Sequence, residues 1–200
     1  MSELAASGAP TDRSLGTLLD EVAAATPAPG GGCSAAWSCA FAAALVEMTA
    51  RITLEREDYR ANHQRLREIV SRARSLRDRA TELGEQELHS YAPVLGVLAL
   101  PRDDPDRAAR LDGALSEAAQ TPVALARVGA EIAALALDAA RTGSPHLRGD
   151  AITAVALAEG GCQAAAQLVT INLAARPGDD RLVEVTEIAE RAAAIRAELI

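Results

Sequence analysis

The most unusual string in the chain is Pro29-Gly30-Gly31-Gly32-Cys33, which stands directly before a long run of small residues. Three glycines expose the backbone N–H groups where a helix is expected to begin. Together with the helix dipole, such an end suits an anion or a carbonyl oxygen. No lysine follows the glycines, so the string is not a nucleotide-binding P-loop. The spacing alone gives equal weight to a flexible loop between two helices.

Three acidic residues are candidates to work beside this string. Asp150 follows a Gly-Ser-Pro loop and opens a second apolar segment, where its spacing favours a helix cap that accepts from a backbone N–H. A carboxylate there also suits an acid, a base or a counter-ion for a cationic substrate. Glu85 and Glu87 point in different directions on a helix, so they form no dyad. Composition favours a solvated face for both, with one of them facing a cleft as the alternative.

Three further residues stand out by their chemistry. Cys33 at a helix N-terminus is expected to have a lowered pKa and to be a candidate nucleophile, although no histidine partner is near it in sequence and a packing role is favoured. Asn172 is an amide in an apolar run and must find hydrogen bonds if it is buried, so its role is either structural or ligand-facing. Glu47 is predicted to pair with Arg51, one helical turn later. No cysteine or histidine spacing matches a metal site, so no metal is predicted.

These residues need a scaffold, and the composition predicts helices. The chain has 200 residues, of which 49% are hydrophobic but only 2% aromatic, so alanine, leucine, valine and isoleucine dominate. No stretch alternates with a period of two, so no sheet is expected. We predict an all-α, up-and-down bundle of about six to eight helices, in which two alanine- and glycine-rich helices, 32–54 and 150–175, lie at the centre. Residues 1–10 are predicted to be a flexible lead and residues 11–200 a single domain, whose first helix is capped by Thr11 or Asp12.

Charge and cysteine usage narrow the function classes. A net charge of -8 and few aromatic residues argue against nucleic acid as a partner. Three cysteines, an odd number, fit a reducing compartment. The longest uncharged stretch, 22–46, is interrupted by two prolines and three glycines, which argues against a membrane span. The N-terminus does not resemble a signal peptide. We therefore predict a soluble, cytoplasmic protein.

The Pro-Gly-Gly-Gly string and the small-residue helix that runs to Glu47-Met48-Thr49 resemble the formimidoyltetrahydrofolate cyclodeaminase / methenyltetrahydrofolate cyclohydrolase family. Leu100-Pro101, Gly149-Asp150 and Ile171-Asn172-Leu173 keep the order of that family, so the resemblance covers nearly the whole chain. It implies an all-helical homodimer that binds a tetrahydrofolate derivative as its substrate and acts without a metal. The expected reaction is hydrolysis of 5,10-methenyltetrahydrofolate to 10-formyltetrahydrofolate, or cyclodeamination of 5-formimidoyltetrahydrofolate.

The resemblance also assigns roles to individual residues. Asp150 and Glu87 become the catalytic acid/base candidates, and Glu87 stands where the family has an aspartate. The expected ligand-binding residues are Gly30, Gly31, Gly32, Cys33, Asn172 and Arg56. Cys33 stands where serine is common, and Arg56 is a partner for the glutamate tail of the folate. Two alternatives stay open: a family relative that cyclises or hydrolyses another imine-like metabolite in a biosynthetic pathway, and a non-catalytic helical interaction module.

Overall fold

Eight α-helices make up most of residues 13–199, the part of the chain that this computed structural model describes. They are α1 (Leu15–Ala23), α2 (Gly31–Leu54), α3 (His63–Ser90), α4 (Ala92–Leu98), α5 (Arg107–Ala118), α6 (Gln120–Thr142), α7 (Arg148–Asn172) and α8 (Asp180–Leu199), with 3₁₀ helices η2 (Glu57–Asn62) and η3 (Pro145–Leu147). No strand occurs in the described range, and the predicted all-α bundle is confirmed. The predicted lead, 1–10, and the predicted caps Thr11 and Asp12 lie outside it. Ser14 caps α1 by accepting from the N–H of Thr17 at 3.1 Å.

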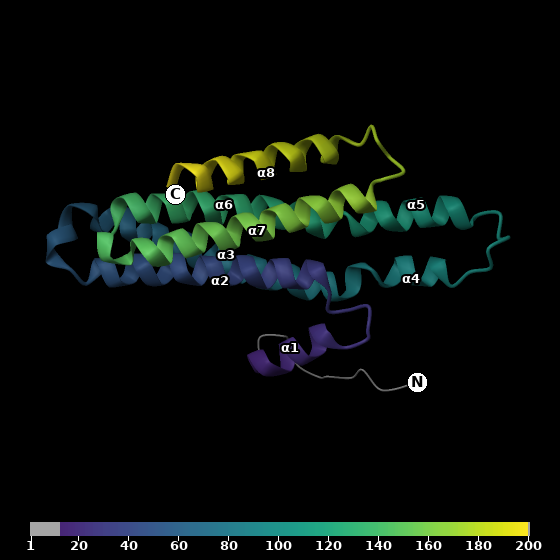
Figure 1. The fold of residues 1–200 in the computed structure, drawn as a ribbon, viewed down its shortest axis with the longest axis horizontal. Helices are drawn as coiled ribbons and strands as arrows, with labels where there is room; N and C mark the ends of the chain where they lie inside the picture. The colour runs from purple at the N-terminus through teal and green to yellow at the C-terminus, as the bar shows by residue number, and fades with distance from the viewer. Residues whose placement is uncertain (1–12, 200) are drawn as a thin grey trace.

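The four long helices alternate in direction along the bundle (Figure 1). α2 starts at the glycine end, which we define by Gly30–Gly32, and α3 returns to that end. The α4–α5 hairpin extends beyond the bundle and leads back into α6, and α7 then runs antiparallel to α2. At the far end, the N–H of Ser144, just before α7, donates to Oγ1 of Thr53 at 3.3 Å. α8 packs on α6 and α7.

Small residues allow the central helices to approach closely, as the composition predicts. A Cβ on Gly161 of α7 would stand 2.5 Å from Sγ of Cys39 and 2.9 Å from the carbonyl oxygen of Ala35, both on α2. Gly129 of α6 lies in the same way against Cys162 of α7, at 3.0 Å from its Cβ. Any side chain at these glycines would push the helices apart, so the alanine and glycine content sets the helix spacing.

Two stretches, Gly31–Leu54 and Pro145–Asn172, are long and apolar enough to cross a membrane by length and composition. Both lie in the bundle, and about half of each is buried against neighbouring helices. The core helices of a soluble protein have the same properties. The apolar character of α2 and α7 is thus explained by their place in the core.

A buried carboxylate joins α2 to α3. Only 7% of the Glu47 side chain is exposed, and it accepts from Arg51 at 2.5 and 2.9 Å, which confirms the predicted ion pair. Arg77 donates to its other oxygen at 2.8 Å, and Arg74 lies 3.2 Å away. Burial alone would raise the pKa of Glu47, but the Arg51 hydrogen bond and the charges of Arg77 and Arg51 lower it below the ordinary value.

We expect Glu47→Gln to lower the free energy of unfolding by about 2 kcal/mol at neutral pH, because three arginines lose their shared carboxylate while water still screens their half-exposed guanidinium groups. The lowered pKa means that ionised Glu47 stabilises the fold above an unfolded-state pKa of about 4.3 and loses this effect as the pH falls through its folded pKa. Urea titrations at several pH values should show the gap between variant and wild type closing in acid. Glu68→Gln, in the exposed Arg65 pair, is the control, with an expected change below about 0.5 kcal/mol. An equal gap in acid would contradict this account.

Candidate active site

The carboxylate of Glu87, in the last turns of α3, lies directly over Gly32 in the first turn of α2. A Cβ on Gly32 would stand 2.5 Å from Cδ of Glu87 and nearer still to its Oε1. The glycine therefore makes room for the acid at the helix N-terminus, where backbone N–H groups have no partner within the helix. This contact joins two parts of the predicted site, the glycine string and one of the two candidate glutamates.

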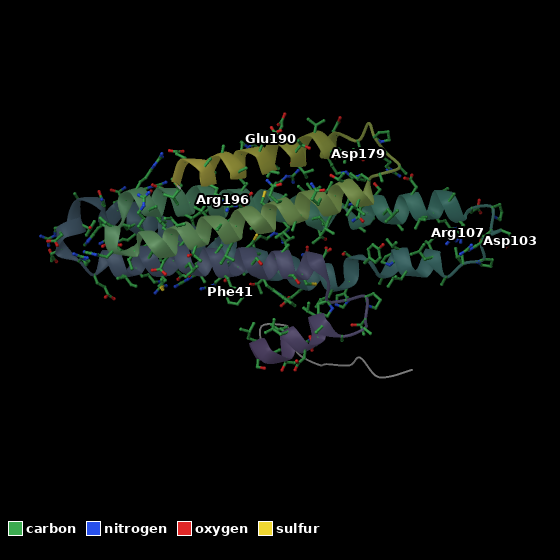
Figure 2. All side chains as sticks on the ribbon, viewed as in Figure 1. Phe41, Asp103, Arg107, Asp179, Glu190 and Arg196 are labelled. Atoms are coloured by element: carbon green, nitrogen blue, oxygen red, sulfur yellow. The ribbon has the colours of Figure 1, made fainter. Side chains whose placement is uncertain are left out.

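The other glutamate faces elsewhere. Glu85 lines a groove of about 600 Å³ on the outer side of α2 and α3, beside Trp37 and Phe41. The helical geometry of α3 separates the two carboxylates, as expected for residues two positions apart. Figure 2 shows Phe41 pointing away from the bundle on this outer side of α2. Of the two glutamates, Glu87 is therefore the one that belongs to the glycine end.

Burial raises the pKa of Glu87 above its ordinary value, because the charged form is poorly solvated there. The hydroxyl of Ser90 donates to Oε2 at 3.0 Å and partly offsets this effect. Within residues 13–199, no arginine forms an ion pair with Glu87, in contrast to Glu47. A carboxylate with a raised pKa and no cation beside it is suited to exchange a proton and to face a positively charged ligand.

Cys33 is the second residue of the site whose pKa shifts, and the prediction of a lowered pKa is wrong. Burial raises the pKa of the thiol, and the nearby charge of Glu87 adds to this, while backbone hydrogen bonds at Gly30 and Cys33 offset only part. The thiol donates to the carbonyl oxygen of Gly84 at 3.5 Å and so joins α2 to α3. The helix N-terminus does not outweigh desolvation here, and Cys33 is a packed thiol rather than a nucleophile.

All three cysteines are expected to resist thiol reagents in the native protein. They are buried, and burial raises the pKa of Cys39 to about 12 and that of Cys162 to about 11. Since the thiolate is the reactive form, labelling with a disulfide reagent should be slower than in concentrated urea by a factor on the order of 100 or more. Peptide mass spectrometry after a short pulse identifies any modified residue. Rapid, stoichiometric labelling of Cys33 without urea would show that its thiolate is accessible.

Asn172 lies at the glycine end, because α7 runs antiparallel to α2 and ends there. It is half-buried, and its side chain makes no hydrogen bond to another residue in the described part of the chain. Because this amide is only half-buried, water can satisfy its hydrogen bonds, and a ligand at the glycine end would replace that water. The glycine end thus contains the glycine string, Cys33 and Glu87, and α7 ends with Asn172 at the same end of the bundle.

Asp150 and Arg56 lie at the far end instead. Arg56 donates to Oγ of Ser144 at 3.1 Å and stacks over the ring of Tyr59 at 5.4 Å. Gly161 is level with Ala35 and Cys39, and Asp150 lies three turns earlier on α7. At about 1.5 Å per helical residue, Asp150 is roughly 20 Å from Gly32 along the bundle. Within a single chain, Asp150 therefore lies far from the glycine end.

The predicted cap at Asp150 is also wrong. α7 begins at Arg148, and Leu147 takes the cap position without a side-chain hydrogen bond. The cause is η3, whose 3₁₀ turn leads directly into α7, so the backbone is already helical when the chain reaches Asp150. The carboxylate stands in the first turn, where the helix dipole favours a negative charge. Its side chain is not used as a cap and remains half-exposed.

In the described range, no group of three or more histidine, cysteine, aspartate or glutamate side chains could hold a metal ion.

The sequence analysis did not identify Ser90, whose hydroxyl donates to the Glu87 carboxylate. A sign of Ser90 was present, since residues three apart on a helix are neighbours. It drew no attention because a serine near a helix end is common.

Comparison with known proteins supports the same reading of the fold. The model of the formiminotransferase-cyclodeaminase family matches residues 14–194, which is most of the chain. The chain belongs to this family. The chain is similar to a methenyltetrahydrofolate cyclohydrolase of Methylorubrum extorquens, with 33% identity over 174 residues that make up 85% of this chain and 83% of that protein.

The chain matches a small part of one further relative and nearly the whole of another. The formimidoyltransferase-cyclodeaminase of Rattus norvegicus is 28% identical over 81% of this chain, which corresponds to only 31% of the rat protein. The crystal structure of a formiminotetrahydrofolate cyclodeaminase from Thermotoga maritima superposes with a TM-score of 0.81 and 25% identity, covering 94% of this chain and 92% of that one. The chain is thus a cyclohydrolase/cyclodeaminase family enzyme, and its fold extends over nearly all of that relative.

Proposed function

We propose that this family enzyme hydrolyses 5,10-methenyltetrahydrofolate to 10-formyltetrahydrofolate in the cytoplasm. The observation that carries the proposal is the Glu87 carboxylate over Gly32, which has no cationic partner in the described chain. The methenyl bridge is an amidinium cation, so an unpaired carboxylate is complementary to its charge. The Methylorubrum cyclohydrolase, which matches this chain over most of both lengths, favours hydrolysis as the reaction.

The chemistry that Glu87 would perform follows from its place. In the first step, a water molecule attacks the methenyl carbon and gives one proton to the Glu87 carboxylate, forming a tetrahedral carbon that bears a hydroxyl group. In the second step, the bond from that carbon to N5 breaks, and N5 takes the proton back from Glu87. The hydroxyl group then gives its proton to solvent water and becomes the formyl oxygen, so that one proton is released for each cation hydrolysed. The raised pKa of Glu87 helps it to hold a proton between the two steps.

The other residues of the glycine end would bind the folate. Gly30, Gly31 and Gly32 offer backbone N–H groups at the start of α2, and Cys33 contributes a neutral wall beside them. Asn172 has both donors and an acceptor for the edge of a heterocycle. We keep Arg56 as a candidate for the carboxylates of the glutamate tail, on the condition that the far end of a second copy lies close by.

A homodimer would bring the two ends together. Residues of α2 and α7 follow one exposed or half-exposed face at helical spacing, which we call the α2–α7 face: Ser34, Ser38, Phe41, Leu45, Met48 and Ile52, with Gly149, Thr153, Gly160, Ala164 and Ile171. Phe41 is 55% exposed, and a Cβ on Gly160 would meet nothing within 4 Å. A large apolar side chain and an open glycine on adjacent helices suit a closely packed interface.

The symmetry of such a dimer has a consequence for catalysis. A two-fold axis that lies in the plane of this interface, perpendicular to the axes of α2 and α7, exchanges the two ends of the bundle. The far end of one copy then lies beside the glycine end of the other. Asp150 of the second copy would then complete the site as counter-ion or proton acceptor, and the dimer would hold two equivalent sites. Light scattering behind a sizing column measures the mass that this requires.

The function is tested by following the near-ultraviolet absorbance of 5,10-methenyltetrahydrofolate after addition of the protein. We expect the wild type to accelerate its loss, and Glu87→Gln to lower that rate on the order of 100-fold or more. Glu85→Gln, two residues away and facing the outer groove, is the matched control and should keep the rate. Absence of acceleration by wild type, or equal loss in both variants, would contradict the proposal.

A second substrate distinguishes the two reactions of the family. The Thermotoga relative is named a formiminotetrahydrofolate cyclodeaminase, so 5-formimidoyltetrahydrofolate is the second substrate to offer. Cyclodeamination releases ammonia and produces the same methenyl absorbance that hydrolysis removes. A rise with this substrate and no loss with the methenyl compound would assign the enzyme to cyclodeamination.

A further inference from the structure

Ser90 is the side chain that holds the Glu87 carboxylate in place. Its hydroxyl donates to Oε2 at 3.0 Å, while the backbone oxygen of Glu87 lies 3.2 Å away as a second acceptor. The other carboxylate oxygen, Oε1, lies over Gly32 and accepts no hydrogen bond from residues 13–199. One oxygen is therefore held and the other is left toward the site.

Among the described residues, Ser90 is the one whose side chain holds the Glu87 carboxylate by a hydrogen bond. The titratable group that faces it from α2 is the neutral Cys33 thiol, and α3 adds no charge beside it. No charged group of α4, α5, α6 or α7 within the described chain acts on its titration. In the absence of a cation, the Ser90 hydroxyl holds the rotamer of Glu87 and is the group that favours its ionised form against the larger opposing effect of burial.

We infer that Ser90 is a positioning residue for Glu87, which fixes Oε2 so that Oε1 presents its lone pairs at the start of α2. The inference rests on the proposed function, since it assumes that Glu87 exchanges the proton. The hydroxyl favours the ionised acid, which is the form needed to take a proton from water. Geometry and proton affinity thus depend on the same hydrogen bond.

The test compares Ser90→Ala with Ser90→Thr, which keeps the hydroxyl, and with Thr81→Val as a matched control. Thr81 lies on the same helix and donates at 3.0 Å to the carbonyl oxygen of Arg77, and its hydroxyl forms no hydrogen bond with a carboxylate of the described chain. Carbon-13 labelling of glutamate, with Glu87→Gln to assign the signal, follows the titration of Glu87 without substrate. The pH profile of kcat/KM is measured in parallel.

Ser90→Ala is expected to raise the proton affinity of Glu87 about tenfold and to move the matching limb of the pH profile upward equally. Its kcat should fall about tenfold with little change in KM, whereas Ser90→Thr and Thr81→Val should stay close to wild type. An unchanged Glu87 titration in Ser90→Ala would overturn the inference. A shifted titration in a protein whose wild type ignores folates would leave Ser90 as the holder of Glu87 and refute the proposed function instead.

Discussion

Gly32→Ala is expected to lower kcat by at least about 100-fold while the protein stays folded. The added Cβ would occupy the space of the Glu87 carboxyl group, at 2.5 Å from Cδ and less from Oε1. The obstacle is the end of a flexible side chain rather than backbone, so the acid turns away and the helices keep their places. Catalysis then fails because a displacement of about 1 Å is enough to misplace a proton acceptor.

Thermal unfolding separates this effect from damage to the fold. Alanine is a better helix former than glycine by up to about 1 kcal/mol, so we expect the melting temperature of Gly32→Ala to stay within a few degrees of wild type. Gly113→Ala is the matched control, since it makes the same change within α5, where a Cβ would meet nothing within 4 Å. It should keep full activity. Wild-type kcat in Gly32→Ala would mean that Glu87 works from another position or not at all.

Local features of the fold were predictable, because they depend on neighbours in sequence. The small-residue pattern predicts helices at 32–54 and 150–175, and the structure has them at Gly31–Leu54 and Arg148–Asn172. Glu47 pairs with Arg51 one turn away as predicted. Arg74 and Arg77 complete the same cluster from α3, and no local pattern indicates them, since they are more than 25 positions distant.

The site was predictable only in part, for a topological reason. The spacing of Glu85 and Glu87 indicates that their side chains point in different directions on the helix. Only the packing of α3 on α2 determines which of them contacts Gly32. α7 runs antiparallel to α2, so the start of α7 lies opposite the start of α2, and the α4–α5 hairpin does not change this direction because it only leads out from α3 and back into α6 (Figure 1). Asp150 opens α7 and therefore lies at the far end, whereas the expectation that it works beside the glycines considered the two helix starts without their relative direction.

Mixing two inactive variants is expected to restore activity if Asp150 serves the glycine end of a second copy. Glu87→Gln and Asp150→Asn should each retain on the order of 1% of the wild-type rate or less. When the two are refolded together, half of the dimers contain one chain of each kind. In such a dimer one site carries both substitutions and the other carries neither. Recovery to about one quarter of the wild-type rate per chain is therefore expected.

The control for this experiment uses two substitutions from the same end of the bundle. Glu87→Gln mixed with Gly32→Ala should recover nothing, because each glycine end in the mixed dimer keeps one defect. Native mass spectrometry of chains with different tags confirms that mixed dimers have formed in both cases. Recovery in the first mixture alone assigns Asp150 to the partner's site. If mixed dimers form and neither mixture recovers, Asp150 does not serve the glycine end of the partner. It then either acts at the far end of its own chain or has no part in the reaction. In the second case, the half-exposed carboxylate in the first turn of α7 is only a favourable charge at a helix N-terminus.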